Sequence, residues 1–541
     1  MKPLLEIDGL SVTFRTRNGD LLAVRDASLS VLPGQTVAIV GESGSGKSTL
    51  TTALNRLLAP NGRVSAGSVT FDGQDLLALS EREMTGIRGR RIGLVPQDPM
   101  SNLNPLLPIG RQIAEVFRVH KVANGKEARA RSLELLSLVG IPEPERRYRQ
   151  YPHEFSGGMR QRVLIAMGLA CRPALLIADE PTSALDVTVQ KIILDELAAL
   201  TASMGTTVLM VTHDLALAAE RADHVVVMNR GQIVESGPAA TVLNEPADDY
   251  TKRLISAAPS LSTGSLVAPA DPETKSRPVM EVVALSKQYA VRKGALGRSS
   301  LFTAVDEVSF RVPPGQTVGI VGESGSGKST TAKMLLMLEK STSGDILFDN
   351  RNVSGIKGAD LLAFRRRVQP VFQNPYASLD SRYTIGDAIR EPLDVHRVGT
   401  PAERDERVAA LLTQVALDPS LAGRYPHELS GGQRQRVAIA RALALEPEVV
   451  ILDEAVSALD VVVQAQILDL LVDLQKRLGL SYVFISHDLA VVRMLCHQVH
   501  VMKSGRIVES GTPEEIFDHP QHTYTRELLA AIPSGDHTEE P

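Results

Sequence analysis

The pattern of hydrophobic and polar positions in the first half of the chain changes repeatedly between two periods. Apolar and polar residues alternate over 4–14 and 21–31, which predicts two antiparallel strands joined by a turn near Gly19. Short apolar runs predict further buried strands at residues 36–40, 67–71, 92–95, 174–178 and 207–212. Helical periodicity separates these runs at residues 49–58, 109–148, 157–169 and 187–200. Strands that alternate with helices indicate a mainly parallel, twisted sheet with helices on both faces.

The longest helical stretch, residues 109–148, carries two apolar faces. One face contains Ile113, Val116 and Phe117, and charged residues separate it from a second apolar face. The second face consists of Leu133, Leu135, Leu136 and Val139. We therefore expect a helical subdomain packed beside the sheet.

The second half of the chain repeats the first after an irregular stretch at residues 261–278. Ser, Thr, Pro, Gly and Ala dominate this stretch and no period survives, so we predict a linker. The motifs described below recur at equal spacings: 23 residues in both halves (179−156; 453−430), then 34 in both (213−179; 487−453). Such a repeat predicts one α/β fold used twice, in domains at residues 1–260 and 279–541.

The predicted strand at residues 36–40 leads into the octet Gly-Glu-Ser-Gly-Ser-Gly-Lys-Ser, and the same octet recurs at residues 322–329. Strand, glycine-rich loop, Lys-Ser and helix together make the phosphate-binding loop called Walker A. Its glycines let backbone N–H groups point at phosphate oxygens, and the helix N-terminus favours the same anion. We expect the lysine to reach the β- and γ-phosphates and the last serine to hold Mg²⁺. The predicted ATP-binding residues of these loops are Gly41, Ser43, Gly44, Ser45, Gly46, Lys47, Ser48 and Thr49, with Gly322, Ser324, Gly325, Ser326, Gly327, Lys328, Ser329 and Thr330.

An acidic pair ends one buried strand in each half, as Asp179-Glu180 and Asp453-Glu454. An aspartate at that place can hold Mg²⁺ beside the phosphate loop, and the following glutamate can orient or deprotonate the attacking water. The alternative is an acidic pair that only caps the end of a strand. The preceding Walker A octet favours the catalytic interpretation.

Glutamine and histidine follow other strands of the same predicted sheet. Gln97 and Gln373 come after short strands, where the amide can accept a hydrogen bond from Mg²⁺-bound water. His213 and His487 come after buried strands, where the ring can donate to a γ-phosphate. In isolation each would be an ordinary loop residue, so its assignment depends on the neighbouring motifs.

Ser-Gly-Gly opens a predicted helix in each half. The residues are Ser156, Gly157 and Gly158 in the first half and Ser430, Gly431 and Gly432 in the second. Serine and two small residues at a helix N-terminus form either an ordinary cap or a second anion site. Two phosphate-seeking loops in each half exceed the need of one nucleotide, so we expect the second loop to serve the nucleotide of the other half.

The composition fits a soluble globular protein of 541 residues, with 43% hydrophobic and 22% charged residues. A net charge of −5 gives no support to a nucleic-acid partner. Two cysteines, Cys171 and Cys496, are too few for a disulfide framework or a four-cysteine metal site. No signal peptide is evident at the first residues, and the apolar runs are too short to span a bilayer. We expect a cytosolic protein, and if it works at a membrane, another chain must span it.

Together and in this order, the motifs resemble those of the nucleotide-binding domains of ATP-binding cassette (ABC) transporters, in two copies over nearly the whole chain. The family's signature, Leu-Ser-Gly-Gly-Gln, stands at residues 429–433 and ends in Gln433, whereas the first half has Phe155 and Met159 at the outer positions. Phe14 and Tyr289 match the aromatic residue that stacks on adenine in the family. The resemblance implies two tandem P-loop ABC-type ATPase domains, each with a mainly parallel sheet core, an antiparallel β subdomain and a helical subdomain.

Two further details bear on the resemblance. The family's loop after the acidic pair appears at residues 183–186 and 457–460. The proline that usually follows the glutamate is present as Pro181 but replaced by Ala455.

In this family the two domains pair head to tail. The resemblance then implies one site that joins Lys47, Ser48, Gln97, Asp179, Glu180 and His213 to the signature at Ser430. The other site joins Lys328, Ser329, Gln373, Asp453, Glu454 and His487 to the signature at Ser156. Mg²⁺ would be held by Ser48, Gln97 and Asp179 in one site and by Ser329, Gln373 and Asp453 in the other. Both glutamates and both histidines are kept, so we expect two hydrolysing sites, although Met159 cannot replace the hydrogen bonds of a glutamine.

The tails of the two halves, residues 248–259 and 522–533, resemble those of oligopeptide and dipeptide importer ATPases, and so do the Tyr-Pro-His-Glu segments before the signatures. This resemblance implies the energising subunit of a peptide importer on the cytoplasmic face of the membrane. Its partners would be two membrane-spanning permease subunits and an extracytoplasmic solute-binding protein. Nickel, glutathione and haem stay open as cargoes. Many relatives carry a cysteine cluster after the tail, and because it is missing here we expect no iron–sulfur centre.

Two other classes of protein share this core. A twin-cassette ATPase acting on ribosomes usually has a long, charged helical linker, whereas residues 261–278 are short and contain Pro and Ala. A DNA-repair ATPase needs long coiled-coil or zinc-binding insertions, and neither is evident. Both alternatives are therefore less well supported than a transporter.

Overall fold

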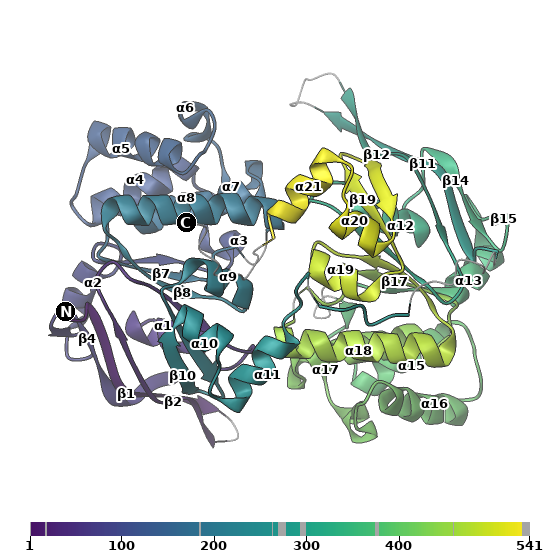
Figure 1. Cartoon of the computed structure of the whole chain (residues 1–541), viewed down its shortest axis with the longest axis horizontal. Coiled ribbons are helices and arrows are strands. Elements are labelled where there is room, and N and C mark those ends of the chain that lie inside the picture. The colour runs from purple at the N-terminus through teal and green to yellow at the C-terminus, as the bar shows by residue number, and fades with distance from the viewer. Residues whose placement is uncertain are drawn as a thin grey trace. The chain divides into compact units, whose positions relative to one another are not determined.

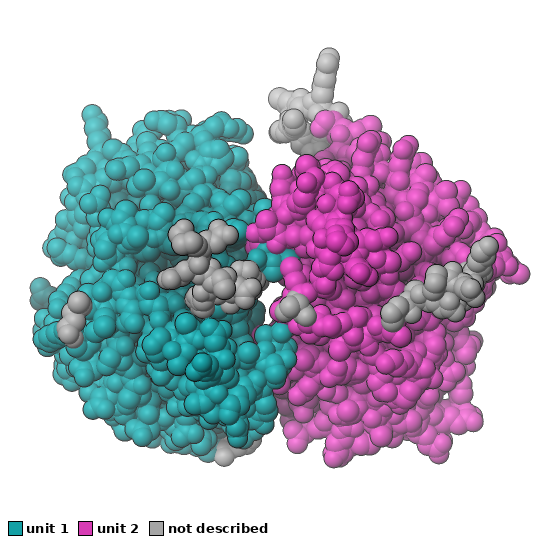
Figure 2. Space-filling model, viewed as in Figure 1, with its two compact units in different colours: residues 1–258, 532–541 teal, residues 259–531 magenta. Residues whose placement is uncertain are grey.

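The computed structural model describes residues 2–16, 19–182, 185–261, 263–268, 277–292, 299–373, 378–457 and 459–532. The chain divides into two compact units, residues 1–258 with 532–541, and residues 259–531 (Figure 2). The expectations that concern Ser183, Ala184, Ser262, Ala458, Pro533 and residues 269–276 lie outside the described residues.

The first unit contains a six-stranded sheet in the order β10-β9-β3-β8-β7-β6. Neighbouring strands are parallel except for β10, which pairs antiparallel with β9. The strands are β3 (Thr36–Val40), β6 (Ile92–Val95), β7 (Leu175–Asp179), β8 (Thr207–Val211), β9 (His224–Asn229) and β10 (Gln232–Pro238). The central strands are buried along almost their whole length, as continuous apolar runs require when helices cover both faces.

A second, antiparallel sheet in the first unit has the order β2-β1-β4-β5. Its strands are β1 (Leu5–Thr16), β2 (Gly19–Val31), β4 (Gly62–Phe71) and β5 (Gln74–Asp75). One hydrophobic core joins the two sheets around α1 and includes Leu5, Val12, Leu50, Leu54 and Ile177. The mainly parallel core with an antiparallel subdomain is thereby confirmed (Figure 1).

The helices of the first unit are α1 (Lys47–Leu54), α2 (Glu81–Ile87), α3 (Pro99–Asn102), α4 (Ile109–Val119), α5 (Gly125–Leu138), α6 (Pro144–Arg147), η1 (Pro152–Glu154), α7 (Gly157–Leu169), α8 (Val187–Met204), α9 (Leu215–Arg221), α10 (Ala239–Asn244) and α11 (Asp249–Ala257). Helices α4, α5 and α6 form the expected helical subdomain next to α7 (Figure 1). Ile113 and Phe117 of α4 are buried there, as their spacing predicts.

Two helix ends differ from the sequence-based expectation. Helix α1 stops at Leu54 and not near residue 58, because Arg56 adopts a φ of 50° that leaves the helical path. Helix α8 continues beyond residue 200 to Met204, where Gly205 ends it with a φ of 65°. A glycine in this left-handed conformation is a common helix terminator.

The second unit repeats the architecture. Its six-stranded sheet has the order β16-β17-β18-β13-β19-β20 and its antiparallel sheet the order β12-β11-β14-β15. The strands are β11 (Met280–Arg292), β12 (Ser299–Val312), β13 (Thr317–Val321), β14 (Ser343–Phe348), β15 (Arg351–Asn352), β16 (Val368–Val371), β17 (Val449–Asp453), β18 (Ser481–Ile485), β19 (Gln498–Lys503) and β20 (Arg506–Gly511). The helices are α12 (Lys328–Leu335), α13 (Gly358–Arg367), α15 (Ile385–Val395), α16 (Pro401–Gln414), η2 (Pro419–Gly423), η3 (Pro426–Glu428), α17 (Gly431–Leu443), α18 (Val461–Leu478), α19 (Leu489–Leu495), α20 (Pro513–Asp518) and α21 (Thr523–Ala530).

Part of the stretch expected to be a linker packs on the second unit. The backbone N–H of Leu266 donates to the carbonyl of Met494 in α19 over 2.8 Å, and Val267 is buried. Among the described residues, no helix combines the length and the hydrophobicity that a membrane crossing requires.

Candidate nucleotide sites

The loop between β3 and α1 requires glycine at its first position. Gly41 has a φ of 144°, and a Cβ atom there would lie 2.2 Å from the carbonyl oxygen of Met228. Gly322 repeats this geometry with a φ of 145° and a distance of 2.1 Å to Met502. Each loop is therefore packed closely against the neighbouring strand, β9 or β19, at its first glycine.

The lysine that follows each loop is buried and folds back over it. Lys47 Nζ donates to the carbonyl oxygens of Gly41 and Glu42 at 2.7 and 2.8 Å. Lys328 Nζ contacts the same positions of its own loop at 2.6 and 2.8 Å. Each ammonium group thus sits at the N-terminus of a helix, where both the charge and the helix dipole favour an anion.

The parallel sheet brings the other predicted residues to the same edge, because the carboxyl ends of β3, β6, β7 and β8 are neighbours. Gln97 Nε2 donates to Glu180 Oε2 at 2.6 Å, and His213 Nδ1 lies 3.2 Å from Glu180 Oε1. Ser48 Oγ donates to Asp179 Oδ1 at 3.2 Å. In the first unit, these contacts connect the glutamine, both acidic residues, the histidine and the loop serine.

The second unit repeats the glutamate cluster. Gln373 Nε2 donates to Glu454 at 2.5 Å, and His487 Nδ1 lies 3.5 Å from the same carboxylate. Both glutamates have a left-handed backbone, with φ of 45° at Glu180 and 49° at Glu454. This conformation is uncommon for a residue with a side chain, and in each case a backbone hydrogen bond of 2.9 Å to the next strand holds it.

The surroundings of these groups shift their pKa values in opposite directions. Burial works against ionisation of Glu180, but the hydrogen bond and charge of His213, with the charge of Lys47, lower its pKa. The hydrogen bond to Glu180 in turn raises the pKa of His213 despite burial. Glu454 and His487 shift in the same directions. Each site therefore holds an ionised glutamate against a histidine that favours its protonated form.

The aspartates provide a test of whether the residues fit Mg²⁺. Burial raises the pKa of Asp179 and of Asp453, so each carboxylate lacks a positive partner of sufficient strength. Asp453 Oδ1 is buried without a hydrogen-bond partner. Carboxylate, hydroxyl and amide oxygens are the ligands that Mg²⁺ prefers. The donor sets at both strand ends fit this ion.

The two Ser-Gly-Gly segments cap helices, but they do so differently. Ser430 Oγ accepts from Gln433 N at 3.3 Å, and Gln433 Oε1 accepts from Ser430 N at 3.0 Å, which makes a reciprocal capping box at α17. Ser156 accepts from Met159 N at 3.3 Å, and the thioether of Met159 provides no return bond. The first cap is therefore the weaker one.

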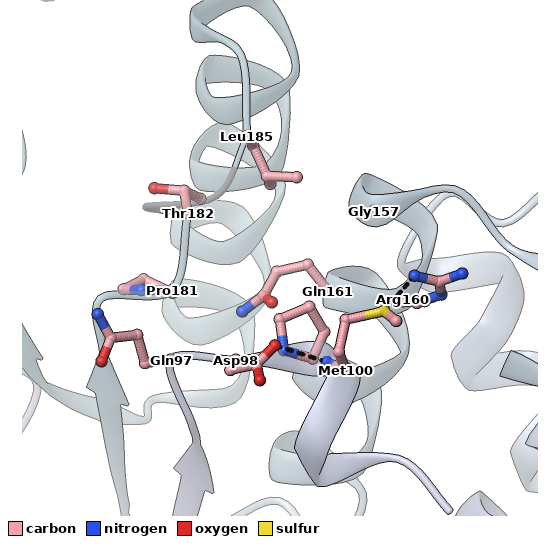
Figure 3. A pocket seen from close by; sticks show the side chains of 10 residues that line it. Gln97, Asp98, Met100, Gly157, Arg160, Gln161, Pro181, Thr182 and Leu185 are labelled. Carbon is pink, nitrogen blue, oxygen red and sulfur yellow. Dashed lines mark hydrogen bonds between the residues drawn. The ribbon is translucent and has the colours of Figure 1, made fainter. Parts of the chain in front are cut away.

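A pocket of about 190 Å³ lies beside the glutamine loop of the first unit (Figure 3). Its lining comes from three segments: the loop and α3 that follow β6, the first turns of α7, and residues after Glu180. Gln161 of α7 is buried among them, and its Nε2 has no hydrogen-bond partner. Asp98 caps α3 by accepting from Met100 N at 2.7 Å. The pocket thus connects the loop of Gln97 with the helix that Ser156 caps.

The structure places the two aromatic candidates on the antiparallel sheets. Phe14 of β1 lies over Gly62, where a Cβ atom would come within 2.6 Å of the ring. The neighbouring strand β2 contacts the phosphate loop, since a Cβ atom on Gly46 would lie 2.8 Å from Ala23 O. Tyr289 of β11 lies under Lys287, whose Nζ is 5.0 Å from the ring centroid. Phe14 is therefore on the sheet that borders the loop, without a direct contact to it among the described interactions.

Sequence reasoning missed two tyrosines that touch the phosphate loops. The hydroxyl of Tyr250 in α11 accepts from Glu42 N, and that of Tyr524 in α21 accepts from Glu323 N, both at 3.1 Å. The signal for them in the sequence is their identical place in the two tails.

The fold and these two sites define a chain with two P-loop nucleotide-binding domains of one type. The model of the ABC transporter family matches residues 24–183 and 305–457, and the chain belongs to this family as an ATP-binding ATPase. The family model "Oligopeptide/dipeptide transporter, C-terminal region" matches residues 234–281 and 508–540. Both matches confirm the resemblance found in the sequence.

Several relatives match the chain over nearly its whole length. The glutathione import ATP-binding protein GsiA of Pectobacterium atrosepticum is 46% identical over 99% of this chain and 90% of its own length. GsiA of Escherichia coli O157:H7 is 46% identical over 98% of this chain and 90% of its own length. Among solved structures, the dimeric post-hydrolysis state of the ATP-binding cassette MJ0796 bound to ADP and Pi is 30% identical. It covers 43% of this chain and 98% of its own, with a TM-score of 0.39.

Proposed function

We propose that the chain is the ATP-hydrolysing subunit of an importer that carries small peptides into the cell, with glutathione as the first candidate cargo. The observation that carries this proposal is the peptide-importer tail, present twice, in a chain whose relatives are named for glutathione import. Glutathione is itself a tripeptide, so the two observations agree on the chemical class of the cargo. Nickel and haem are the alternative solutes.

Different residues of the chain bind the phosphates, activate the attacking water and position the catalytic carboxylates. Lys47 and Lys328 bind the terminal phosphates, and the loop N–H groups hold the remaining phosphate oxygens. Glu180 and Glu454 accept the proton of the attacking water, and their lowered pKa keeps them ionised for this task. His213 and His487 fix these carboxylates and donate toward the γ-phosphate.

Mg²⁺ would be held by Ser48, Gln97 and Asp179 in one site, where it offsets the charge on the phosphates. Ser329, Gln373 and Asp453 would hold it in the other. In both units the glutamine Nε2 already binds the catalytic glutamate, which leaves its amide oxygen for the ion or its water.

Each site is completed by the signature of the other half. Ser430, Gly431, Gly432 and Gln433 would meet the nucleotide on Lys47, and Ser156, Gly157 and Gly158 the nucleotide on Lys328. The N-cap position of both serines supports this pairing, since the first turns of α7 and α17 carry N–H groups that favour an anion. ATP would close the two halves and hydrolysis would reopen them.

The partners would be two permease subunits and an extracytoplasmic solute-binding protein, with the chain held peripherally at the cytoplasmic face of the membrane. The pocket between Gln97 and α7 supports this arrangement, because a permease segment seated there would contact both the loop that binds Glu180 and the helix capped by Ser156.

The test is reconstitution of the chain in liposomes with candidate permease and solute-binding proteins from the same organism. Glutathione or a dipeptide loaded on the binding protein should stimulate ATP hydrolysis and accumulate inside. The control is E180Q/E454Q, which should bind ATP without transport. Stimulation by nickel or haem alone would identify another cargo, and co-purification with ribosomes in the absence of permease would contradict the importer.

A further inference from the structure

The peptide unit between Gly41 and Glu42 is hydrogen-bonded on both of its sides. Its N–H, that of Glu42, donates to the hydroxyl of Tyr250 at 3.1 Å. Its C=O, that of Gly41, accepts from Lys47 Nζ at 2.7 Å. The N–H and C=O of a trans peptide point in opposite directions. The tyrosine and the lysine therefore hydrogen-bond to opposite edges of the same planar peptide group.

The second unit has the same arrangement, built from its own residues. Glu323 N donates to the hydroxyl of Tyr524 at 3.1 Å, and Gly322 O accepts from Lys328 Nζ at 2.6 Å. Both tyrosines are buried, with 6% and 2% of their surface exposed. Because these hydroxyl groups are shielded from solvent, water competes little for the hydrogen bonds that they make.

The tails fix these tyrosines through carboxylates on the last strand of each sheet. Glu235 of β10 accepts from Ala247 N and Asp248 N at 2.8 and 3.1 Å, and Asp248 in turn accepts from Tyr250 N at 2.8 Å. This chain of contacts determines where α11 begins and where its tyrosine points.

The second tail uses the same device. Glu509 of β20 accepts from Gln521 N and His522 N at 2.7 and 3.2 Å, and His522 Nδ1 accepts from Tyr524 N at 3.1 Å. Different capping residues, Asp248 and His522, therefore present a tyrosine at the same place in both units. Such agreement favours a role for the hydroxyl itself over accidental packing.

We infer that Tyr250 and Tyr524 are positioning residues for ATP, which act through the first peptide of each phosphate loop on the orientation of Lys47 and Lys328. Without the hydroxyl, the N–H of Glu42 or Glu323 loses its acceptor and the peptide can rotate. The lysine then loses its fixed acceptor at Gly41 or Gly322. The C-terminal tail of each half is thus part of the nucleotide site, an inference that rests on ATP binding at the two loops.

The experiment compares Y250F, Y524F and the double variant with the wild-type full-length chain. Phenylalanine keeps the ring and removes only the hydroxyl. We expect KM for ATP, and Kd for a fluorescent ATP analogue, to rise about threefold to tenfold, the range set by one hydrogen bond. We expect kcat at saturating ATP to change by less than about twofold, since saturating ATP compensates for a weaker affinity.

The matched control is Y482F. Tyr482 is equally buried and donates to Leu471 O at 3.0 Å, away from the phosphate loops. This variant should lower the melting temperature and leave KM for ATP unchanged.

If Y250F and Y524F only lower the melting temperature, as Y482F does, the inference is wrong. The double variant K47A/K328A gives the baseline for zero binding. If the wild-type chain binds no more ATP analogue than this variant, the nucleotide sites are wrong and so is this inference.

Discussion

Nε2 of Gln97 donates a hydrogen bond to the carboxylate of Glu180 over 2.6 Å. The residue after Gln97 caps a short helix that lines the pocket beside α7. A group that enters this pocket therefore meets a loop that is directly bonded to the proposed catalytic base. The contact gives a physical route by which a partner outside the nucleotide site can affect hydrolysis.

Replacement of either glutamate tests whether both sites hydrolyse ATP. E180Q and E454Q keep the shape of the side chain but remove the base, and loss of a base costs about 100-fold or more at the affected site. Each single variant should lose at least half of the steady-state ATP turnover, and the double variant nearly all of it. Nucleotide binding, measured in parallel, should persist. Full turnover in one single variant would mean that the two sites are not equivalent.

The asymmetry of the two helix caps can be reversed by mutation. M159Q should build the return bond to Ser156 N that Gln433 makes to Ser430, and Q433M should remove it. One such bond stabilises the protein by about 0.5–1.5 kcal/mol. We expect a higher melting temperature for M159Q and a lower one for Q433M. Equal shifts of the same sign in both variants would contradict the capping argument.

The orphaned carboxylate oxygen of Asp453 predicts a dependence on divalent metal. D453N retains the size of the side chain and removes the charge that Mg²⁺ needs. The Mg²⁺ concentration for half-maximal hydrolysis should rise on the order of tenfold or more, since even outer partners of a metal contribute this much. The control is D473N, because Asp473 pairs with Arg477 on the exposed surface of α18. Hydrolysis by the wild-type chain in excess EDTA would contradict a metal requirement.

His500 of β19 predicts a loss of stability in acid. Burial lowers its pKa from 6.5 to about 4, so between these values the unfolded chain binds a proton that the folded chain does not. Stability therefore falls as the pH decreases through this window, by about 3 kcal/mol in total from this residue. The measurement is the free energy of unfolding of the second unit, obtained from its urea-induced transition at pH 7 and at pH 4.5.

The first unit supplies the matched control for this experiment. Val226 pairs with Ile39 where His500 pairs with Ile320, so valine already occupies the equivalent position. H500V should reduce the acid sensitivity of the second unit, and V226H should introduce it in the first. An unchanged pH dependence in H500V would mean that other groups determine the acid transition.

The strands and motifs could be read from the sequence because local patterns determine them. The short strand β6 and the octet at Gly41 were placed correctly, and so were both sheets. The end of α1 was not, since the left-handed turn at Arg56 depends on the tertiary path of the chain.

Contacts between distant segments escaped prediction for the same reason. Tyr250 reaches Glu42 across 208 positions of sequence, and no local period encodes such a pairing. The bond between Gln97 and Glu180 likewise depends on the order of strands in the sheet. Sequence therefore proposed the chemical groups of the candidate site, and the fold was needed to show which of them touch.

The difference between Met159 and Gln433 has a consequence for how such a machine can evolve. When one gene encodes a single cassette that must pair with an identical copy, every substitution alters both signatures at once. Here each signature is encoded separately within one polypeptide, so one half can weaken while its duplicate is preserved. The presence of both halves in one polypeptide thereby permits one nucleotide site to become slower than the other. Translation of a single chain always supplies the two halves in equal amounts.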